Sequence, residues 1–279
     1  MSSVHRIIAA DLHRVPKPFR AFAVRSEEPC HAFEARAPLG HVHLVRTAFL
    51  DADALAGLVA QGHARVNIEA VSEVTHADTT LQDLADAVPG SANQADLASA
   101  LAAALQLTGV LGADTAGYRR SLDERIHYLA CRGAGFHNDV ARHWSRCLFW
   151  LLTLDATEVE FVQPHAGVRI ALAPGDLLVF DQTMEHGLCR PQDQGQAVAA
   201  SFETGEHRHQ LFLTGELPLT DAQWAALGAP WLAVEAHQQR GALDLLVAEF
   251  DERSGAIKQL RALADGMQRS TCHVDEAAC

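Results

Sequence analysis

A series of short β-forming runs fills the chain between Arg125 and Leu213. Turn-forming residues separate the runs, as the Pro-Gly-Asp of residues 174–176 does. Several short strands at such spacing predict a sandwich or a small barrel. The predicted strands are Ile126–Ala130, Cys147–Leu154, Glu158–Val162, Val168–Leu172, Leu177–Phe180, Ala197–Glu203 and Gln210–Leu213.

Upstream of this β-rich stretch the pattern changes from strand to helix. Residues 40–47 alternate in polarity and predict a strand. Asp51 is a candidate N-cap for a helix that carries Leu55, Leu58 and Val59 on its apolar face. The upstream segment is therefore expected to contain both a strand and a helix.

Further helices are predicted on both sides of the β-rich stretch. Residues 79–108 resemble two helical pieces that Pro89 and Gly90 separate. Beyond Pro230, apolar residues return at helical spacing. These residues are Leu243, Leu246, Val247 and Phe250.

We therefore predict one domain of 279 residues that is mainly β with flanking helices. Residues 1–121 are expected to form a buttress of helix and strand. Residues 122–215 would form the core with the functional site, and residues 216–279 a C-terminal helical segment.

Composition limits the environment and the partners of the protein. A formal net charge of −13 makes nucleic acid an unfavourable partner, because both surfaces are negative. The six cysteines form no CxxC pair, and no stretch has the length and apolarity of a membrane span. We expect a cytoplasmic protein without a leader segment, and the sequence leaves its oligomeric state open.

Two histidines and one aspartate form a candidate metal site. His137 and Asp139 lie two residues apart in GFHNDV (residues 135–140), so on a strand they point the same way. His186 follows the predicted strand Leu177–Phe180. Two imidazoles and one carboxylate can hold a ferrous ion on one face and leave positions open for O₂. We interpret other histidines, such as those at positions 165, 207 and 209, as ordinary surface or core residues.

The segment from about Ile126 to Glu203 resembles the iron- and 2-oxoglutarate-dependent dioxygenases, especially the branch of prolyl hydroxylases and phytanoyl-CoA hydroxylases. Residues 135–139 (GFHND) and 174–187 (PGDLLVFDQTMEHG) are similar to the two ligand segments of that family. Residues 46–51 resemble its strand-to-helix opening. The rest of the chain matches only in outline.

The resemblance implies a double-stranded β-helix core, also called a jelly-roll or cupin-like fold. It further implies Fe(II) bound by His137, Asp139 and His186, with 2-oxoglutarate as co-substrate. Decarboxylation of that acid would be coupled to oxidation, most simply hydroxylation, of a C–H bond in a small molecule. Since Asp139 is retained where related halogenases carry Gly or Ala, the resemblance does not favour halogenation.

The chain departs from the family pattern where 2-oxoglutarate is usually anchored. The strand after the last histidine normally supplies an Arg or Lys, but here those positions hold Gln196 and Ala197. A neutral amide cannot form the charge-assisted pair that arginine forms with a carboxylate. Arg146, which leads into an apolar strand, is the preferred replacement, and Arg190 is the second candidate or a contact for a substrate carboxylate. An ordinary ion pair stays open for both.

Four other residues near the motifs have two possible roles each. Tyr128 could reach 2-oxoglutarate through its hydroxyl or pack in the core. Asn138 could contact substrate or cap a loop, and Trp144 could line the substrate pocket or pack. Asp181 could orient the ring of His186 or be solvated.

Two alternatives keep the barrel and change the function. The first is a cupin-like enzyme that binds Fe, Mn or Zn without 2-oxoglutarate, which the missing arginine at positions 196–197 favours. The second is a barrel that binds a metal or ligand without catalysis, since a fold alone does not determine function.

Overall fold

The computed structural model describes the core of the chain and separate flanking segments. The described residues are 3–8, 23–26, 32–36, 39, 41–46, 50–66, 74–87, 103, 126–137, 147–193, 209–230, 232–235, 246–250 and 257–262. The helices are α1 (Ala52–Arg65), α2 (Leu81–Asp86) and α5 (Asp221–Ala226), with short 3₁₀ turns at Pro164–Ala166 and Pro191–Asp193.

Strands make up most of the described structure, as the sequence predicted. Those before the β-rich stretch are β1 (Ser3–Ile8), β2 (Ala23–Ser26), β3 (Ala32–Arg36), β4 (His41–Arg46) and β5 (Val74–Thr79). The later strands are β6 (Ile126–Cys131), β7 (Ala134–His137), β8 (Cys147–Asp155), β9 (Glu160–Gln163), β10 (Val168–Ala171), β11 (Asp176–Phe180), β12 (His186–Cys189), β13 (Gln210–Pro218), β14 (Leu232–Glu235), β15 (Leu246–Phe250) and β16 (Ile257–Ala262).

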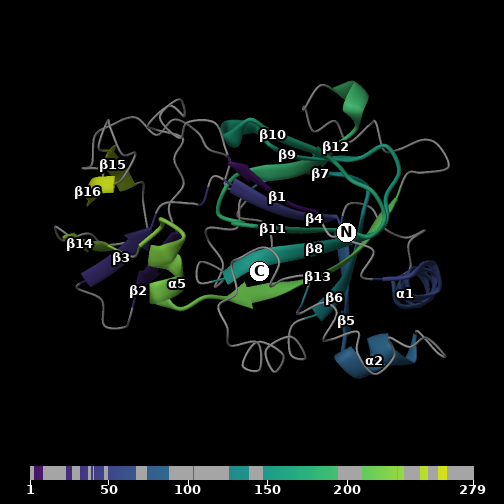
Figure 1. Ribbon diagram of the computed structural model, residues 1–279. Coiled ribbons are helices and arrows are strands. Elements are labelled where there is room, and N and C mark those ends of the chain that lie inside the picture. The colour runs from purple at the N-terminus through teal and green to yellow at the C-terminus, as the bar shows by residue number, and fades with distance from the viewer. Residues whose placement is uncertain are drawn as a thin grey trace.

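Two antiparallel sheets carry the centre of the molecule. The larger has seven strands in the order β1-β4-β11-β8-β13-β6-β5, and the smaller has four in the order β10-β9-β12-β7. Figure 1 shows the smaller sheet layered over the larger one, with α1 and α2 near the β5–β6 edge. A three-stranded sheet, β14-β3-β2, and the β15–β16 pair lie to one side.

The chain passes repeatedly between the two central sheets. Strands β6, β8, β11 and β13 belong to the larger sheet, whereas β7, β9, β10 and β12 belong to the smaller one. Within each sheet the neighbours come from distant parts of this stretch. For example, β12 lies between β7 and β9. Residues that are far apart in sequence therefore lie side by side in the same sheet.

Apolar side chains fill the space between the two sheets. Phe161 and Leu188 of the smaller sheet belong to the same buried cluster as Leu151, Phe180 and Phe212 of the larger sheet. Burial of this apolar surface is the main favourable contribution to holding the sheets together.

A second core covers the opposite face of the larger sheet. Trp150 and Leu152 of β8 pack there in one cluster with Leu58 of α1 and Leu84 of α2. Successive residues of β8 point to opposite faces of the sheet, and most of them are buried, so β8 is buried on both sides. Burial on both sides explains the uninterrupted apolar run CLFWLLTL.

The helix predicted after Asp51 is confirmed. The side chain of Asp51 accepts a hydrogen bond from the Ala54 backbone N–H at 2.7 Å and caps α1. Of the two helical pieces predicted within residues 79–108, the first corresponds to α2. Most of the second lies outside the described residues, as does the predicted strand 197–203.

The helix predicted from Leu243 to Phe250 is wrong where the structure describes it. Residues 246–250 form β15, which pairs antiparallel with β16. A short apolar run fits either a helix or a strand, and pairing with a second strand decides between them. None of the described helices is long and apolar enough to cross a membrane.

Candidate metal centre

The structure brings His137 and His186 together at one edge of the smaller sheet. His137 is the last residue of β7 and His186 the first of β12, and they are direct partners in the antiparallel ladder. Their ring centroids are 4.5 Å apart, with an angle of 52° between the planes. The convergence expected from the sequence therefore occurs for the two histidines.

Both rings are fixed by the same kind of hydrogen bond. Nδ1 of His137 lies 2.7 Å from the carbonyl oxygen of Gly135, and Nδ1 of His186 lies 2.8 Å from that of Met184. A carbonyl oxygen only accepts, so Nδ1 carries the proton and donates in both rings. The lone pair of each neutral imidazole is then on Nε2, which is the form that binds a metal.

The surroundings of His186 favour its neutral form. Its side chain is buried, and its ring centroid lies 4.9 Å from that of Phe180 and 6.1 Å from that of Phe161. Burial, and then the neighbouring His137 ring, lower the pKa of His186 to about 3. A lone pair is thus available at neutral pH on the buried side of the pair, whereas His137 is exposed.

Gln163 lies on the same wall and was not predicted. Strands β9 and β12 pair so that Phe161 is opposite Leu188, and the same register places Gln163 beside His186. The side chain of Gln163 is fully buried, and neither its amide nitrogen nor its oxygen has a hydrogen-bond partner among the described residues. An unpaired buried amide is unfavourable, so a ligand beside His186 could satisfy it. The sequence feature that could have indicated Gln163 is that it is a polar residue on the same face as Phe161 in the strand EFVQ (160–163).

Asp181 is not solvated, and its carboxylate does not bond to the His186 ring itself, whose Nδ1 meets the Met184 carbonyl oxygen instead; this corrects both roles considered for Asp181. It is fully buried and forms an ion pair with Arg36, with Arg36 Nη1 2.5 Å from Asp181 Oδ2. Because Arg36 precedes Asp181 by 145 residues, no local pattern could indicate this contact.

Tyr128 occupies the core-packing role of the two that the sequence left open. Its hydroxyl donates to Oε1 of Gln61 at 2.6 Å, on the side of the larger sheet that α1 covers. The inward-facing neighbour on β6 is Leu129 instead, which packs against the cluster between the sheets. The predicted contact of Tyr128 with 2-oxoglutarate has no support from this placement, because adjacent strand residues face opposite sides.

Arg190 is held by a turn at the far end of β12. Its Nη1 donates to the carbonyl oxygen of Thr157 at 2.8 Å and to that of Glu158 at 3.4 Å. Glu158 has a positive φ of 54°, an uncommon backbone conformation that these hydrogen bonds help to hold. These contacts fit the structural role that the sequence left open for Arg190.

The remaining predicted site residues lie outside the described residues. They are Asn138, Asp139, Trp144, Arg146, Gln196 and Ala197. Within the described part of the chain, no group of three His, Cys, Asp or Glu side chains is placed to hold a metal ion. The observed donor set is therefore the histidine pair, and Asp139 stays a predicted third ligand.

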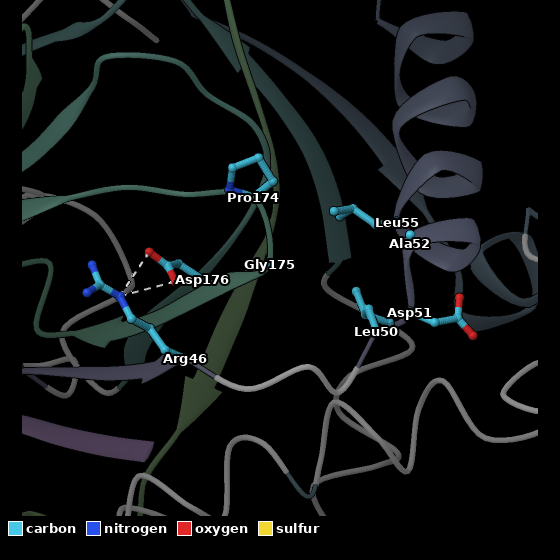
Figure 2. Close-up of a pocket in the computed structure, with 8 residues that line it drawn as sticks. All are labelled: Arg46, Leu50, Asp51, Ala52, Leu55, Pro174, Gly175 and Asp176. Carbon is cyan, nitrogen blue, oxygen red and sulfur yellow. Dashed lines mark hydrogen bonds and ion pairs between the residues drawn. The ribbon is translucent and has the colours of Figure 1, made fainter. Parts of the chain in front are cut away.

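A pocket of about 330 Å³ lies elsewhere, between the start of α1 and the turn before β11. Figure 2 shows Arg46 and Asp176 on one side of it and Leu50 and Leu55 on the other. Asp51 points away from this pocket, consistent with its role as the helix cap. The pocket has no residue in common with the histidine site.

Comparison with known proteins adds little to this geometry. No protein-family model and no curated protein matches the chain. Among solved structures, the chain is similar to a prolyl-4-hydroxylase from Pseudomonas putida, with 18% sequence identity and a TM-score of 0.35. The match covers 72% of this chain and 94% of that one. At this TM-score the likeness carries no weight for fold or activity, and the residues themselves have to support any function.

Proposed function

We propose that the chain is a non-haem iron oxygenase that uses 2-oxoglutarate to oxidise, most simply to hydroxylate, a small molecule. The histidine pair is the observation that carries this proposal. His137 and His186 adjoin on paired strands, and hydrogen bonds at both Nδ1 atoms leave both Nε2 atoms for a metal. Asp139 would complete a set of two imidazoles and one carboxylate, the set of non-haem iron oxygenases.

The order of the central strands supports a double-stranded β-helix for the core. Strands β6 to β13 form two facing antiparallel sheets, with β11-β8-β13-β6 in one and β10-β9-β12-β7 in the other. Numbered by sequence from one to eight, these orders are 6-3-8-1 and 5-4-7-2, the arrangement of a jelly-roll. This arrangement makes the two strands that bear histidines neighbours.

Each residue of the site has a distinct part in this proposal. When bound, Fe(II) would activate O₂ with electrons from 2-oxoglutarate, which is decarboxylated to succinate. His137, Asp139 and His186 would hold the ion, while Phe161 and Phe180 keep water from its buried side. Nε2 of Gln163 would donate a hydrogen bond to the bound acid or substrate.

The residues that complete the site are proposed from the sequence. Arg146 is our candidate for binding the distal carboxylate of 2-oxoglutarate, because Arg190 is held by the turn at 157–158. Asn138 and Trp144 would contact the substrate. The net charge of −13 favours a small molecule over nucleic acid as substrate. Buried free thiols at Cys131 and Cys189 are compatible with a cytoplasmic protein.

The proposal is tested by anaerobic titration of the full chain with Fe(II) and then 2-oxoglutarate. The weak visible charge-transfer band of the chelate should appear in the parent protein and disappear in His137→Ala and His186→Ala. His127→Ala is the matched control, because His127 pairs with Asp78 at 2.8 Å on a different strand. This variant should keep the band. Under air, the parent protein and His127→Ala should form succinate, and His137→Ala and His186→Ala should not.

Two results would overturn the proposal in different ways. Tight binding of Fe(II), Mn(II) or Zn(II) without a chelate band or succinate would favour the cupin-like enzyme that does not use 2-oxoglutarate. Failure of the parent protein to bind any divalent metal would exclude a metal site at the histidine pair. Loss of the band in His127→Ala as well would indicate a general defect in folding.

A further inference from the structure

Three segments that are distant in sequence meet beside the histidine site. Arg36 ends β3, Asp181 follows β11, and Trp224 lies in α5. All three side chains are fully buried, and Cζ of Arg36 lies 3.6 Å from the centroid of the Trp224 ring. Figure 1 shows α5 beside the sheet that contains β3. A charged guanidinium is thus held between a carboxylate and an aromatic face.

The carboxylate of Asp181 has a full set of hydrogen bonds. Oδ2 accepts from Arg36 Nη1 at 2.5 Å and from the Leu39 backbone N–H at 2.8 Å. Oδ1 accepts from Arg36 Nη2 at 3.2 Å, and from the backbone N–H and hydroxyl of Thr183 at 3.1 and 2.7 Å. Burial alone would raise the pKa of Asp181, but Arg36 and these hydrogen bonds outweigh it and lower the pKa.

This ion pair connects to the ring of His186 through the backbone of one turn. The backbone N–H of Met184 donates to the carbonyl oxygen of Asp181 at 3.1 Å and closes a turn over residues 181–184. The carbonyl oxygen of Met184 then accepts the Nδ1–H of His186 at 2.8 Å. The position of one carboxylate thereby determines where the acceptor for the imidazole lies.

We propose that Arg36 and Asp181 are positioning residues that set the ring orientation and the tautomer of His186. The buried pair holds the turn 181–184, and the turn presents the Met184 carbonyl that keeps the proton on Nδ1. Nε2 is then directed away from the turn, with its lone pair available to a metal. The inference rests on the proposed function only in that the ligand of this Nε2 is a metal ion.

The chemistry of the pair fits positioning better than simple stabilisation. Burying two charges has a large desolvation cost, and apolar residues of similar volume often stabilise a protein as well or better. An ion pair has what apolar residues lack, namely directional hydrogen bonds to defined atoms. Here Asp181 accepts such bonds from Thr183, which lies in the loop that ends at His186, and from Leu39, which is distant in sequence.

The test compares three variants of the full-length chain. Asp181→Asn replaces an acceptor oxygen with a donor facing Arg36. The double variant Arg36→Met with Asp181→Leu removes both charges and keeps the site filled, so it should stay folded. Asp176→Asn is the matched control, because Asp176 begins the strand that Asp181 follows and also pairs with an arginine, Arg46.

The first measurement needs no metal. Nitrogen NMR shifts of the His186 ring should report one tautomer with the proton on Nδ1 in the parent protein and in Asp176→Asn. Both variants at Asp181 should show a mixture of tautomers. The parent tautomer and ring shifts in the double variant would overturn the inference, because the pair would then be structural only. This result is independent of whether the protein is an oxygenase.

The second measurement is Co(II) affinity, followed by the visible absorption of the bound ion. Loss of a residue that orients a metal ligand typically weakens binding by about 10- to 100-fold, and we expect this range for both variants at Asp181. Asp176→Asn should bind Co(II) like the parent protein. Parent-like affinity in the folded double variant contradicts the inference, whereas absent binding in the parent protein contradicts the proposed function instead.

Discussion

The two ends of β11 carry the same pair of residue types in opposite surroundings. At the start, Asp176 lies 3.4 Å from Nε of Arg46, and the side chain of Asp176 is 7% exposed but that of Arg46 is 47% exposed. At the other end, Asp181 pairs with Arg36, and both side chains are 0% exposed. The first pair closes a turn beside a surface pocket, and the second fixes the loop that carries His186.

The difference between the two ends shows that burial, more than residue type, determines what an ion pair does. An ion pair with one solvent-exposed partner, as Arg46 is here, is weakened by water and salt, because solvent can replace that partner. A buried pair cannot lose one partner without leaving a charge in an apolar interior. The end near His186 is therefore the rigid one, and the end at Asp176 tolerates change.

The largest effect is expected from removing one charge at the buried end. Arg36→Met should lower the free energy of unfolding by about 3–5 kcal/mol, because Asp181 is left buried and unpaired. Arg46→Met should cost only about 0–1 kcal/mol, because water can take the place of the half-exposed Arg46 guanidinium beside Asp176. Urea unfolding of both variants measures the contrast. Equal losses at the two ends would show that burial does not separate the pairs.

Two glycines allow a second contrast: Gly175 precedes β11, and Gly187 lies in β12, next to His186. A Cβ at Gly187 would lie 2.8 Å from the Ala134 carbonyl oxygen, so Gly187→Ala should separate β12 from β7 and cost about 1–3 kcal/mol. Gly175 has a φ of +88° and open space around its Cβ position, so Gly175→Ala should cost about 1–2 kcal/mol through backbone strain alone. Only the change at Gly187 should weaken Co(II) binding, because only it disturbs the spacing of the two histidines.

Substitution of Gln163 should stabilise the ligand-free protein, whereas the substitutions above destabilise it. Because its buried amide has no hydrogen-bond partner in the part of the chain that the structure describes, Gln163→Leu is expected to raise the free energy of unfolding by about 1–3 kcal/mol in the ligand-free protein. The same change should weaken binding of 2-oxoglutarate, measured by the chelate band. Gln210→Leu is the control, since Oε1 of Gln210 accepts from the Gly133 N–H at 2.6 Å, and its loss should destabilise. A lower stability for Gln163→Leu would mean that its amide is paired in solution.

The smallest effects concern pH, and they should differ in sign at the two ends. The pKa of Asp181 is lowered from 3.8, because Arg36 and its hydrogen bonds outweigh burial. The stability that the ionised carboxylate contributes to the folded protein is therefore complete above pH 3.8 and is lost as pH falls through the folded pKa. Burial raises the pKa of Asp176 above 3.8. The stability that its protonated carboxyl group contributes to the folded protein is therefore complete below pH 3.8 and is lost as pH rises through the folded pKa. On acidification, the parent protein should thus lose stability relative to Asp181→Asn and gain it relative to Asp176→Asn. Urea unfolding at a series of acidic pH values, with each variant beside the parent, measures both trends.

Local patterns predicted much of the fold correctly. The N-cap at Asp51 and the alternation in β4 depend on residues only a few positions apart. The predicted strand runs from Ile126 to Phe180 agree with the structure to within about two residues, the usual uncertainty of element ends. β13 continues to Pro218, beyond the predicted end at Leu213, and β7 and β12 were not predicted as strands. The Leu246–Phe250 segment failed because its apolar residues fit either period, and its partner strand lies in a different part of the chain.

The candidate site shows the same division between local and distant information. His137 and His186 could be selected from their residue types and from the strands around them. The face that Tyr128 occupies could not be predicted, because both Tyr128 and its neighbour Leu129 are suited to a core, and the sequence of β6 does not indicate which face lies between the sheets. Gln163 became significant only when its register beside His186 was known.

The sequence by itself determined the short strands, the first helix cap and the identity of the two imidazoles, because these depend on side-chain chemistry and backbone preferences within a few residues. Tertiary structure alone decided that β12 lies beside β7 and that Arg36 reaches Asp181 across 145 positions. Strand register and buried charge pairs join segments that have no local influence on each other. They form only when apolar burial has brought those segments together.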